Sequence, residues 1–255
     1  MRVFISAIAI WTMALLSAGA AQSGRALRVA AASDLQAALP EIVKGFERES
    51  GAAVTVSFGS SGNFFAQIQN GAPFDVYFSA DIDYPRRLVA SKHAVASSLY
   101  RYATGRIVLW TRTDSGVDVQ RGLSILKDTT VKRIAIANAK LAPYGRAAEA
   151  ALRHDNLYDA VRGKLVIGDN ISQTAQLVDS GNADVGIIAL SLALGRTLRA
   201  SGRYVEIPDS SHPPIEQAAV IVAASKNKAL AGELLAYLKR PEVGQRLHEF
   251  GFMTR

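Results

Sequence analysis

S-F-G-S-S-G-N-F-F-A-Q-I-Q-N-G-A-P-F-D-V, residues 57–76, is the stretch that decides the fold. It continues a strand-like alternation of apolar and polar residues over 53–58, breaks at Gly59–Gly62, and resumes as a helical pattern that Asn70 and Gly71 end. A strand that ends in glycines and hydroxyls and then opens a helix gathers free backbone N–H groups at the positive end of the helix dipole. The stretch therefore predicts an anion seat, although one such junction alone is more often an ordinary capped helix.

The same succession of strand and helix extends over most of the chain. Strands are expected at residues 27–32, 53–58, 74–79, 106–111, 133–138, 164–167, 183–190 and 217–224. The run at 183–190 (A-D-V-G-I-I-A-L) has the continuous apolar character of a buried parallel strand, and two helices are expected to close the chain. The alternation predicts an α/β fold with mostly parallel sheets flanked by helices.

The pattern repeats after a turn-rich segment at 113–122, which indicates two lobes. We expect lobe 1 to comprise residues 25–106 with 217–255, and lobe 2 to comprise residues 107–216. Two lobes joined by crossing strands leave a cleft between them. In open α/β sheets, ligands bind outside the carboxyl ends of the strands, so the cleft is the expected binding site.

A second junction follows the first expected strand. Ser33 with Gln36 three residues later matches a capping box, so Ser33 is expected to cap the next helix. Pro40 lies inside that helical pattern and is expected to kink it or break its first turn, and Gly51 is expected to end it.

Composition narrows the possible functions. The chain has 255 residues, 49% of them hydrophobic, and a net charge of +7. Lys and Arg are spread along the chain and the aromatic residues do not lie among them, so nucleic-acid binding is not expected. The absence of Cys excludes disulfides and thiol catalysis, and the four His show no metal-ligand spacing.

The N-terminus has the pattern of a signal peptide. Arg2 precedes an apolar run from Val3 to Leu16, and small residues follow. A run of about 14 residues is short for a membrane span, so cleavage after Ala20 or Ala21 and export of the mature protein are expected.

Four strand-to-helix junctions, two in each half, lie at Ser33, Ser60–Ser61, Tyr144 and Asn170–Ile171. Together they could hold an anion through neutral donors. A hydrogen bond to a charged group contributes about 1.5–3 kcal/mol, so roughly six or seven exceed the ~12 kcal/mol of a nanomolar complex. The residues alone leave open whether the four junctions converge or are unrelated helix caps.

Several segments together resemble the periplasmic molybdate-binding proteins of ABC transporters. They are L-R-V-A-A-A-S-D-L at 27–35, residues 57–80, A-P-Y-G-R-A-A-E-A-A-L at 142–152, residues 170–186, and the final segment at 237–252. The resemblance implies a type II two-lobed periplasmic binding protein that captures molybdate, and also tungstate, in the interlobe cleft. It further implies a periplasmic monomer that delivers its ligand to an ABC permease in the inner membrane and uses no cofactor.

Carried over by position, the ligand contacts of that family fall on the hydroxyls and N–H groups of Ser33 and Ser61, and on the N–H groups of Tyr144 and Ile171. Two positions depart from the family pattern. Ala189 stands where some members use a Tyr to reach the ligand, and Asp34 stands where others use an Asn.

Asp34 leaves the choice of anion open. A carboxylate beside a dianion is unfavourable unless it points away, caps the helix or takes a proton-bearing donor. Molybdate and tungstate are fully deprotonated at neutral pH, whereas hydrogen phosphate keeps a proton that Asp34 could accept. Phosphate and sulfate therefore remain alternatives. An enzyme is not expected, because the chain has neither a G-x-S-x-G element nor a P-loop.

Overall fold

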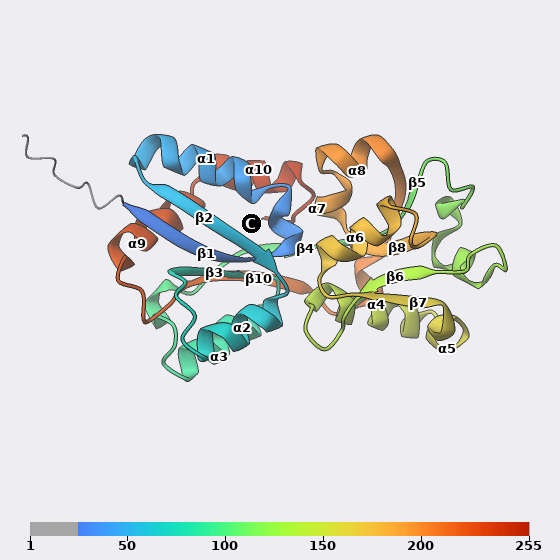
Figure 1. Ribbon diagram of the computed structural model, residues 1–255, viewed down its shortest axis with the longest axis horizontal. Helices are drawn as coiled ribbons and strands as arrows, with labels where there is room; N and C mark the ends of the chain where they lie inside the picture. Colours follow the sequence, from blue (N-terminus) through green and yellow to red (C-terminus); the bar gives the residue numbers. More distant parts are fainter. Residues whose placement is uncertain (1–24, 255) are drawn as a thin grey trace, which may run out of the picture.

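The computed structural model describes residues 25–254, which form two sheets lying side by side (Figure 1). The sheet of lobe 1 has the order β2 (Ala53–Gly59), β1 (Ala26–Ala32), β3 (Val76–Ser79), β10 (Ile215–Ile221) and β4 (Tyr100–Gly105). The sheet of lobe 2 has the order β7 (Leu165–Gly168), β6 (Ile134–Ala137), β8 (Val185–Ala189), β5 (Ile107–Arg112) and β9 (Gly202–Glu206).

Both sheets follow one scheme. In lobe 1, β1 is parallel to β2 and β3, whereas β10 is antiparallel to both of its neighbours, so β4 runs in the direction of β3. In lobe 2, β6 is parallel to β7 and β8, and β5 is antiparallel to β8 and β9. One strand of each sheet therefore opposes the other four, and the predicted α/β architecture of two lobes is confirmed.

Helices cover both faces of each sheet (Figure 1). In lobe 1, α1 (Leu39–Ser50), α9 (Lys228–Leu238) and α10 (Pro241–Glu249) bury their apolar residues on one face, and α2 (Ser61–Gln69) and α3 (Asp83–Ala90) on the other. The helices of lobe 2 are α4 (Pro143–His154), α5 (Tyr158–Val161), α6 (Ile171–Asp179), α7 (Leu190–Ala193) and α8 (Arg196–Ser201).

Of three helix features expected near the N-terminus, one is wrong and two are confirmed. The predicted capping box at Ser33 is wrong: residues Ser33–Gln36 form a separate 3-10 turn, η1, whose N-cap position is Ala32 without a side-chain cap. The break expected at Pro40 is confirmed, because α1 starts at Leu39 with Pro40 in its first turn, where a missing N–H costs nothing. Gly51 ends α1 with φ 65°, as expected.

Short elements fill segments that were expected to be irregular. Two strands, β4 and β9, were not predicted. Four further 3-10 segments are η2 (Ala96–Ser98), η3 (Val119–Lys127) in the stretch expected to be turn-rich, η4 (Arg162–Lys164) and η5 (Asp209–Ser211).

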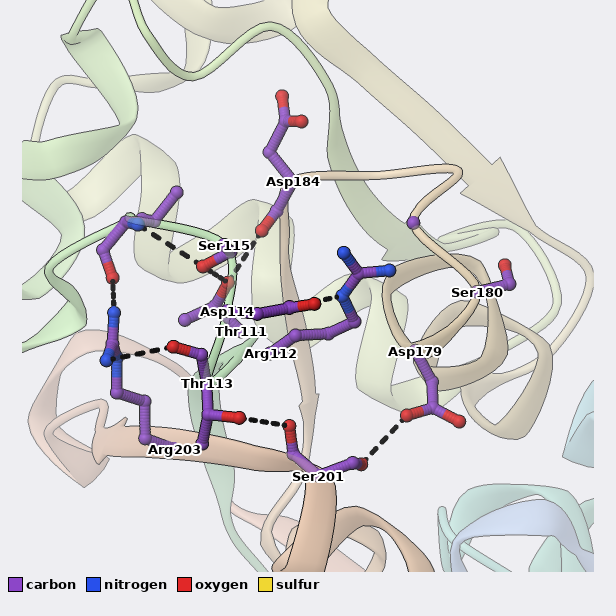
Figure 2. Close-up of polar contacts among 12 residues, drawn as sticks. Thr111, Arg112, Thr113, Asp114, Ser115, Asp179, Ser180, Asp184, Ser201 and Arg203 are labelled. Carbon is purple, nitrogen blue, oxygen red and sulfur yellow. Dashed lines mark hydrogen bonds and ion pairs between the residues drawn. The ribbon is translucent and has the colours of Figure 1, made fainter.

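A polar cluster at the end of β5 away from lobe 1 is structural (Figure 2). The fully buried Thr111 hydroxyl lies 2.7 Å from both the carbonyl oxygen of Asp184 and the hydroxyl of Ser115. Ser201 donates to Asp179 at 2.8 Å, and its carbonyl accepts from the N–H of Thr113. These bonds join β5, α6 and α8 within lobe 2.

Among residues 25–254, no helix combines the length and the apolar character that a membrane span requires. The predicted signal peptide, residues 1–20, lies outside the described residues.

Candidate functional site

The four predicted ligand residues lie around one small cavity between the lobes. Its volume is about 10 Å³. It is lined by Ala32, Ser33, Asp34, Gly59, Ser60, Ser61, Ala80, Ala142, Pro143, Tyr144 and Ile171. The junctions that were separate in the sequence therefore meet, two from each lobe, at the carboxyl ends of β1 and β2 and the first turns of α2, α4 and α6.

Three serines line the lobe 1 side of the cavity. Ser60 is the N-cap of α2 and accepts from the N–H of Asn63 at 3.3 Å, so Ser61 is the first helical residue rather than the cap. The Ser61 hydroxyl accepts from the N–H of Ala80 at 3.0 Å, which leaves its own proton available to a ligand. Ser33 begins η1 at the end of β1 and is almost completely buried.

Two helix starts form the lobe 2 side. Tyr144 is the second residue of α4, after Pro143, and Ile171 is the first residue of α6. Asn170 caps α6 by accepting from the N–H of Gln173 at 3.0 Å. Caps of this kind satisfy the third N–H of a helix, so the first N–H groups have no partner within it. The arrangement places neutral donors and three α-helix dipoles around one point, which suits an anion.

The two lobes touch directly around the cavity. The N–H of Gly62 in α2 donates to the carbonyl of Leu141 at 2.9 Å, and the Ser33 hydroxyl donates to Asn170 Oδ1 at 3.1 Å. Arg146 pairs with Asp81 across the same boundary. The cavity of about 10 Å³ lies at this boundary, so its size depends on how closely the two lobes approach each other.

On the lobe 1 side of the cavity wall, Asp34 is the one residue with a carboxyl group. It is completely buried, and its Oδ2 accepts from the Tyr144 hydroxyl at 3.0 Å and from Gln217 Nε2 at 2.7 Å. Burial raises the pKa of Asp34 to about 7, against the opposing effect of the hydrogen bonds from Gln217 and Tyr144. Asp34 therefore does not point to solvent: it takes side-chain donors from both lobes, and the backbone N–H groups of Asp34 and Leu35, in the first turn of η1, also lower its pKa.

Gln217 and Tyr102 complete the network around Asp34 and were not predicted. The Tyr102 hydroxyl donates to Gln217 Oε1 at 2.7 Å, and Gln217 Nε2 also donates to the Tyr144 hydroxyl at 2.9 Å. Burial and the charge of Asp34 raise the pKa values of Tyr102 and Tyr144 well above the ordinary tyrosine value. The available signal was Gln217 itself, an amide directly before the apolar run A-A-V-I of β10.

Other features do not compete with this cavity. A groove of about 980 Å³ lies between α6, α8 and the start of α1, and its wall includes the charged side chains of Glu41, Asp179 and Arg196. Residues 25–254 hold no cluster of His, Cys, Asp and Glu that could bind a metal ion. Ala189, fully buried before α7, is not part of the cavity wall.

Comparison with known proteins gives one family. The model of the bacterial extracellular solute-binding proteins matches residues 27–253. The chain is 38% identical over 237 residues to the molybdate-binding protein ModA of Azotobacter vinelandii, covering 93% of each chain. It is 36% identical to ModA of Rhodobacter capsulatus, covering 92% of this chain and 90% of that one. The solved structure of the A. vinelandii periplasmic molybdate-binding protein superposes with a TM-score of 0.84 at 32% identity, over 90% of this chain and 99% of that one.

Proposed function

The chain belongs to the bacterial extracellular solute-binding protein family, and on this premise we propose that it captures molybdate between its lobes for an ABC transporter. The anion sits at the cavity formed by Ser33, Ser61, Tyr144 and Ile171. The protein holds the oxygens through hydrogen bonds and places no ligand on the metal atom itself. Tungstate, with the same charge and shape, binds at the same place.

One observation carries this proposal: helix starts from both lobes converge on a buried point without a Lys or Arg in its wall. Neutral donors suffice, because each hydrogen bond to a charged group contributes about 1.5–3 kcal/mol and several are available. Because the contacts come from both lobes, the anion binds the closed state better than the open one. That difference in affinity is what drives closure.

The closed protein then presents its bound anion to a membrane permease. This role requires no bond to be made or broken, and the protein acts as a binding protein rather than an enzyme. The signal-peptide pattern at residues 1–20 supports export to the periplasm, where the protein works as a monomer.

Isothermal titration of residues 22–255 with molybdate, tungstate, sulfate and phosphate tests the proposal. We expect tight binding of molybdate and tungstate, because a site made of donors suits a fully deprotonated dianion. Sulfate is smaller and fills the site less well, and hydrogen phosphate needs an acceptor. Tight binding of phosphate or sulfate without molybdate would overturn the proposed ligand, and silence towards all four would overturn oxyanion capture.

A single hydroxyl tests the placement of the site. We expect Ser61→Ala to weaken molybdate binding roughly 10- to 100-fold, because it removes one hydrogen bond to a charged ligand. Ser124→Ala, at an exposed position of η3 in lobe 2, is the matched control and should bind as the wild type does. Unchanged binding by Ser61→Ala would place the anion elsewhere.

A further inference from the structure

A buried network of side-chain hydrogen bonds joins the two lobes behind the anion cavity. It runs from Tyr102 in β4 through Gln217 in β10 to Asp34 after β1, all in lobe 1, and ends at Tyr144 in α4 of lobe 2. Ser191, from α7 of lobe 2, also donates to the carbonyl of Asp34 at 2.7 Å. Asp34 is thus held at the boundary that opens and closes.

The hydrogen-bond donors of this network determine which of its atoms carry the protons. Tyr102 donates to Gln217 Oε1, so the amide nitrogen of Gln217 is the donor towards Asp34 Oδ2 and towards the oxygen of Tyr144. The Tyr144 hydroxyl then donates to the same Oδ2. Oδ2 has two side-chain donors, whereas Asp34 Oδ1 is buried with no hydrogen-bond partner of good geometry among the described residues; the backbone N–H groups of Asp34 and Leu35 lie close enough to the carboxyl to lower its pKa in part.

Among residues 25–254, no positively charged side chain is paired with the carboxyl of Asp34. The titratable groups that act on it are the hydroxyls of Tyr144 and Tyr102, which are neutral at pH 7. The charged side chains of the surrounding elements have other partners or lie at the surface. Arg146 contacts Asp81, Arg101 contacts Glu216, and Asp179 contacts Ser201. Neither β2 nor α7 contains a charged residue. In α1, Glu47 accepts from the backbone N–H of Val54 in β2, and the other charged residues are exposed.

We propose that Asp34 makes anion capture proton-dependent: closure of the lobes encloses its carboxyl in the neutral form, with the proton on Oδ1, beside the doubly charged ligand. The inference rests on the proposed function for the identity of the ligand. A buried carboxylate with an unpartnered oxygen next to a dianion is costly, because desolvation and like charge both disfavour it. A neutral carboxyl removes both costs and turns Oδ1 from an acceptor into a donor.

The sign of the pH effect follows from the two states. In the closed state burial raises the pKa of Asp34 to about 7, whereas an exposed Asp in the open state has its ordinary value near 3.9. Closure therefore takes up a proton between these values. The resulting advantage is complete below the ordinary value and is lost as the pH rises through about 7, or higher if the bound dianion raises the pKa further.

Titration with molybdate at about pH 6 and about pH 8 tests this. We expect the affinity of the wild type to fall about tenfold or more over this range. Asp34→Asn keeps the shape and supplies a permanently neutral group, so its affinity should stay nearly constant and should exceed that of the wild type at the higher pH. A wild type without pH dependence, or an Asp34→Asn variant with the same dependence, would overturn the inference.

Asp75→Asn is the matched control, because Asp75 is a buried carboxylate of lobe 1 whose oxygens accept from the N–H of Arg28 and the hydroxyl of Ser225. It should keep the pH dependence of the wild type, and its loss in this variant would also overturn the assignment to Asp34.

A measurement without any anion separates this inference from the proposed function. Asp34 is buried in the folded protein and exposed on unfolding, so the Tm of the wild type relative to Asp34→Asn should fall by roughly 3 °C between about pH 6 and about pH 8. An unchanged Tm difference would overturn the inference whatever ligand binds. If neither protein binds molybdate at either pH, the proposed function fails, and the unfolding data alone decide whether Asp34 holds the proton.

Discussion

Tyr144 serves both lobes at once. Its backbone lies in the first turn of α4, facing the cavity, while its hydroxyl reaches Asp34 Oδ2 and Gln217 Nε2 in lobe 1. The side chain is almost completely buried, so neither partner can turn to water when the hydroxyl is lost. One residue therefore couples the position of a ligand donor to contact between the lobes.

Removal of that hydroxyl tests the coupling. We expect Tyr144→Phe to lower the free energy of unfolding by about 1–3 kcal/mol, because Asp34 and Gln217 each lose a buried partner. Molybdate affinity should fall as well, although the backbone donor remains. Urea denaturation and calorimetric titration measure the two effects. Tyr204→Phe, at a half-buried position of β9, should change neither. Unaltered molybdate affinity in Tyr144→Phe would mean that the hydroxyl does not contribute to closure of the lobes.

At this scale, backbone donors were predictable from the sequence, whereas side-chain partners were not. The junctions at Ser61, Tyr144 and Ile171 were recognisable because a helix start exposes N–H groups whatever surrounds it. Ser33 was expected to cap its own helix, but its hydroxyl bonds Asn170, 137 residues further along the chain. The spacing of residues along the chain predicts hydrogen-bond partners that are near in sequence. It carries no information on partners that only the tertiary structure brings together.

Among the elements, the start of α4 lies very close to the end of its neighbour, strand β6. Gly145 in its first turn lies so near the end of β6 that an added Cβ would be 2.2 Å from the carbonyl oxygen of Ala137. Backbone cannot move away as a flexible side chain can. A glycine here therefore sets how closely the helix start, and with it the N–H of Tyr144, approaches the end of the strand.

Gly145→Ala should accordingly destabilise the protein by about 1–3 kcal/mol or more through this overlap. The matched control is Gly232→Ala in α9, where an added Cβ meets no atom within 4 Å. That change should stabilise the protein by about 0.5–1 kcal/mol, because alanine loses less conformational freedom in a helix. Thermal unfolding of both variants gives the comparison, and equal Tm shifts would contradict the close approach of α4 to β6.

Buried strands were predictable, as were the edge strands β2 and β7, whereas the other two edge strands, β4 and β9, were not. The apolar runs of β1, β6 and β8 stand out because both faces of these strands are covered. In contrast, β4 reads Y-R-Y-A-T-G and β9 reads G-R-Y-V-E, each at an edge of its sheet and each partly exposed. Neither has a run or an alternation long enough to distinguish it from a loop.

For the whole molecule, the sequence predicted two lobes and a cleft but not how closely the lobes approach. That distance depends on pairs such as Gly62 with Leu141 and Ser33 with Asn170, which come from different lobes and are far apart along the chain. The volume of the cavity depends on the same pairs. Selectivity among anions of different size therefore depends on how far the lobes close, and no local sequence pattern predicts that distance.

Gly62 is the position where closure can be tested without touching a donor side chain. Its N–H donates to the carbonyl of Leu141 in lobe 2, and an added Cβ would lie 2.7 Å from that oxygen and 3.0 Å from the Cα of Leu141. Gly62→Ala therefore places a wedge between the lobes. Within lobe 1 its closest atom is the hydroxyl of Tyr84, at the end of a side chain that can shift.

We expect Gly62→Ala to keep the free energy of unfolding within about 1 kcal/mol of the wild type, since alanine is tolerated in a helix and the clash lies between lobes that can part. Molybdate affinity should fall at least about tenfold, because donors from the two lobes can no longer reach one anion together. Small-angle X-ray scattering should show the wild type becoming more compact with molybdate and the variant less so. Gly244→Ala in α10, with no atom within 4 Å of the added Cβ, should behave as the wild type. If Gly62→Ala binds and compacts fully, the ligand-bound state must be more open than the structure described above, with room for the anion already between the lobes.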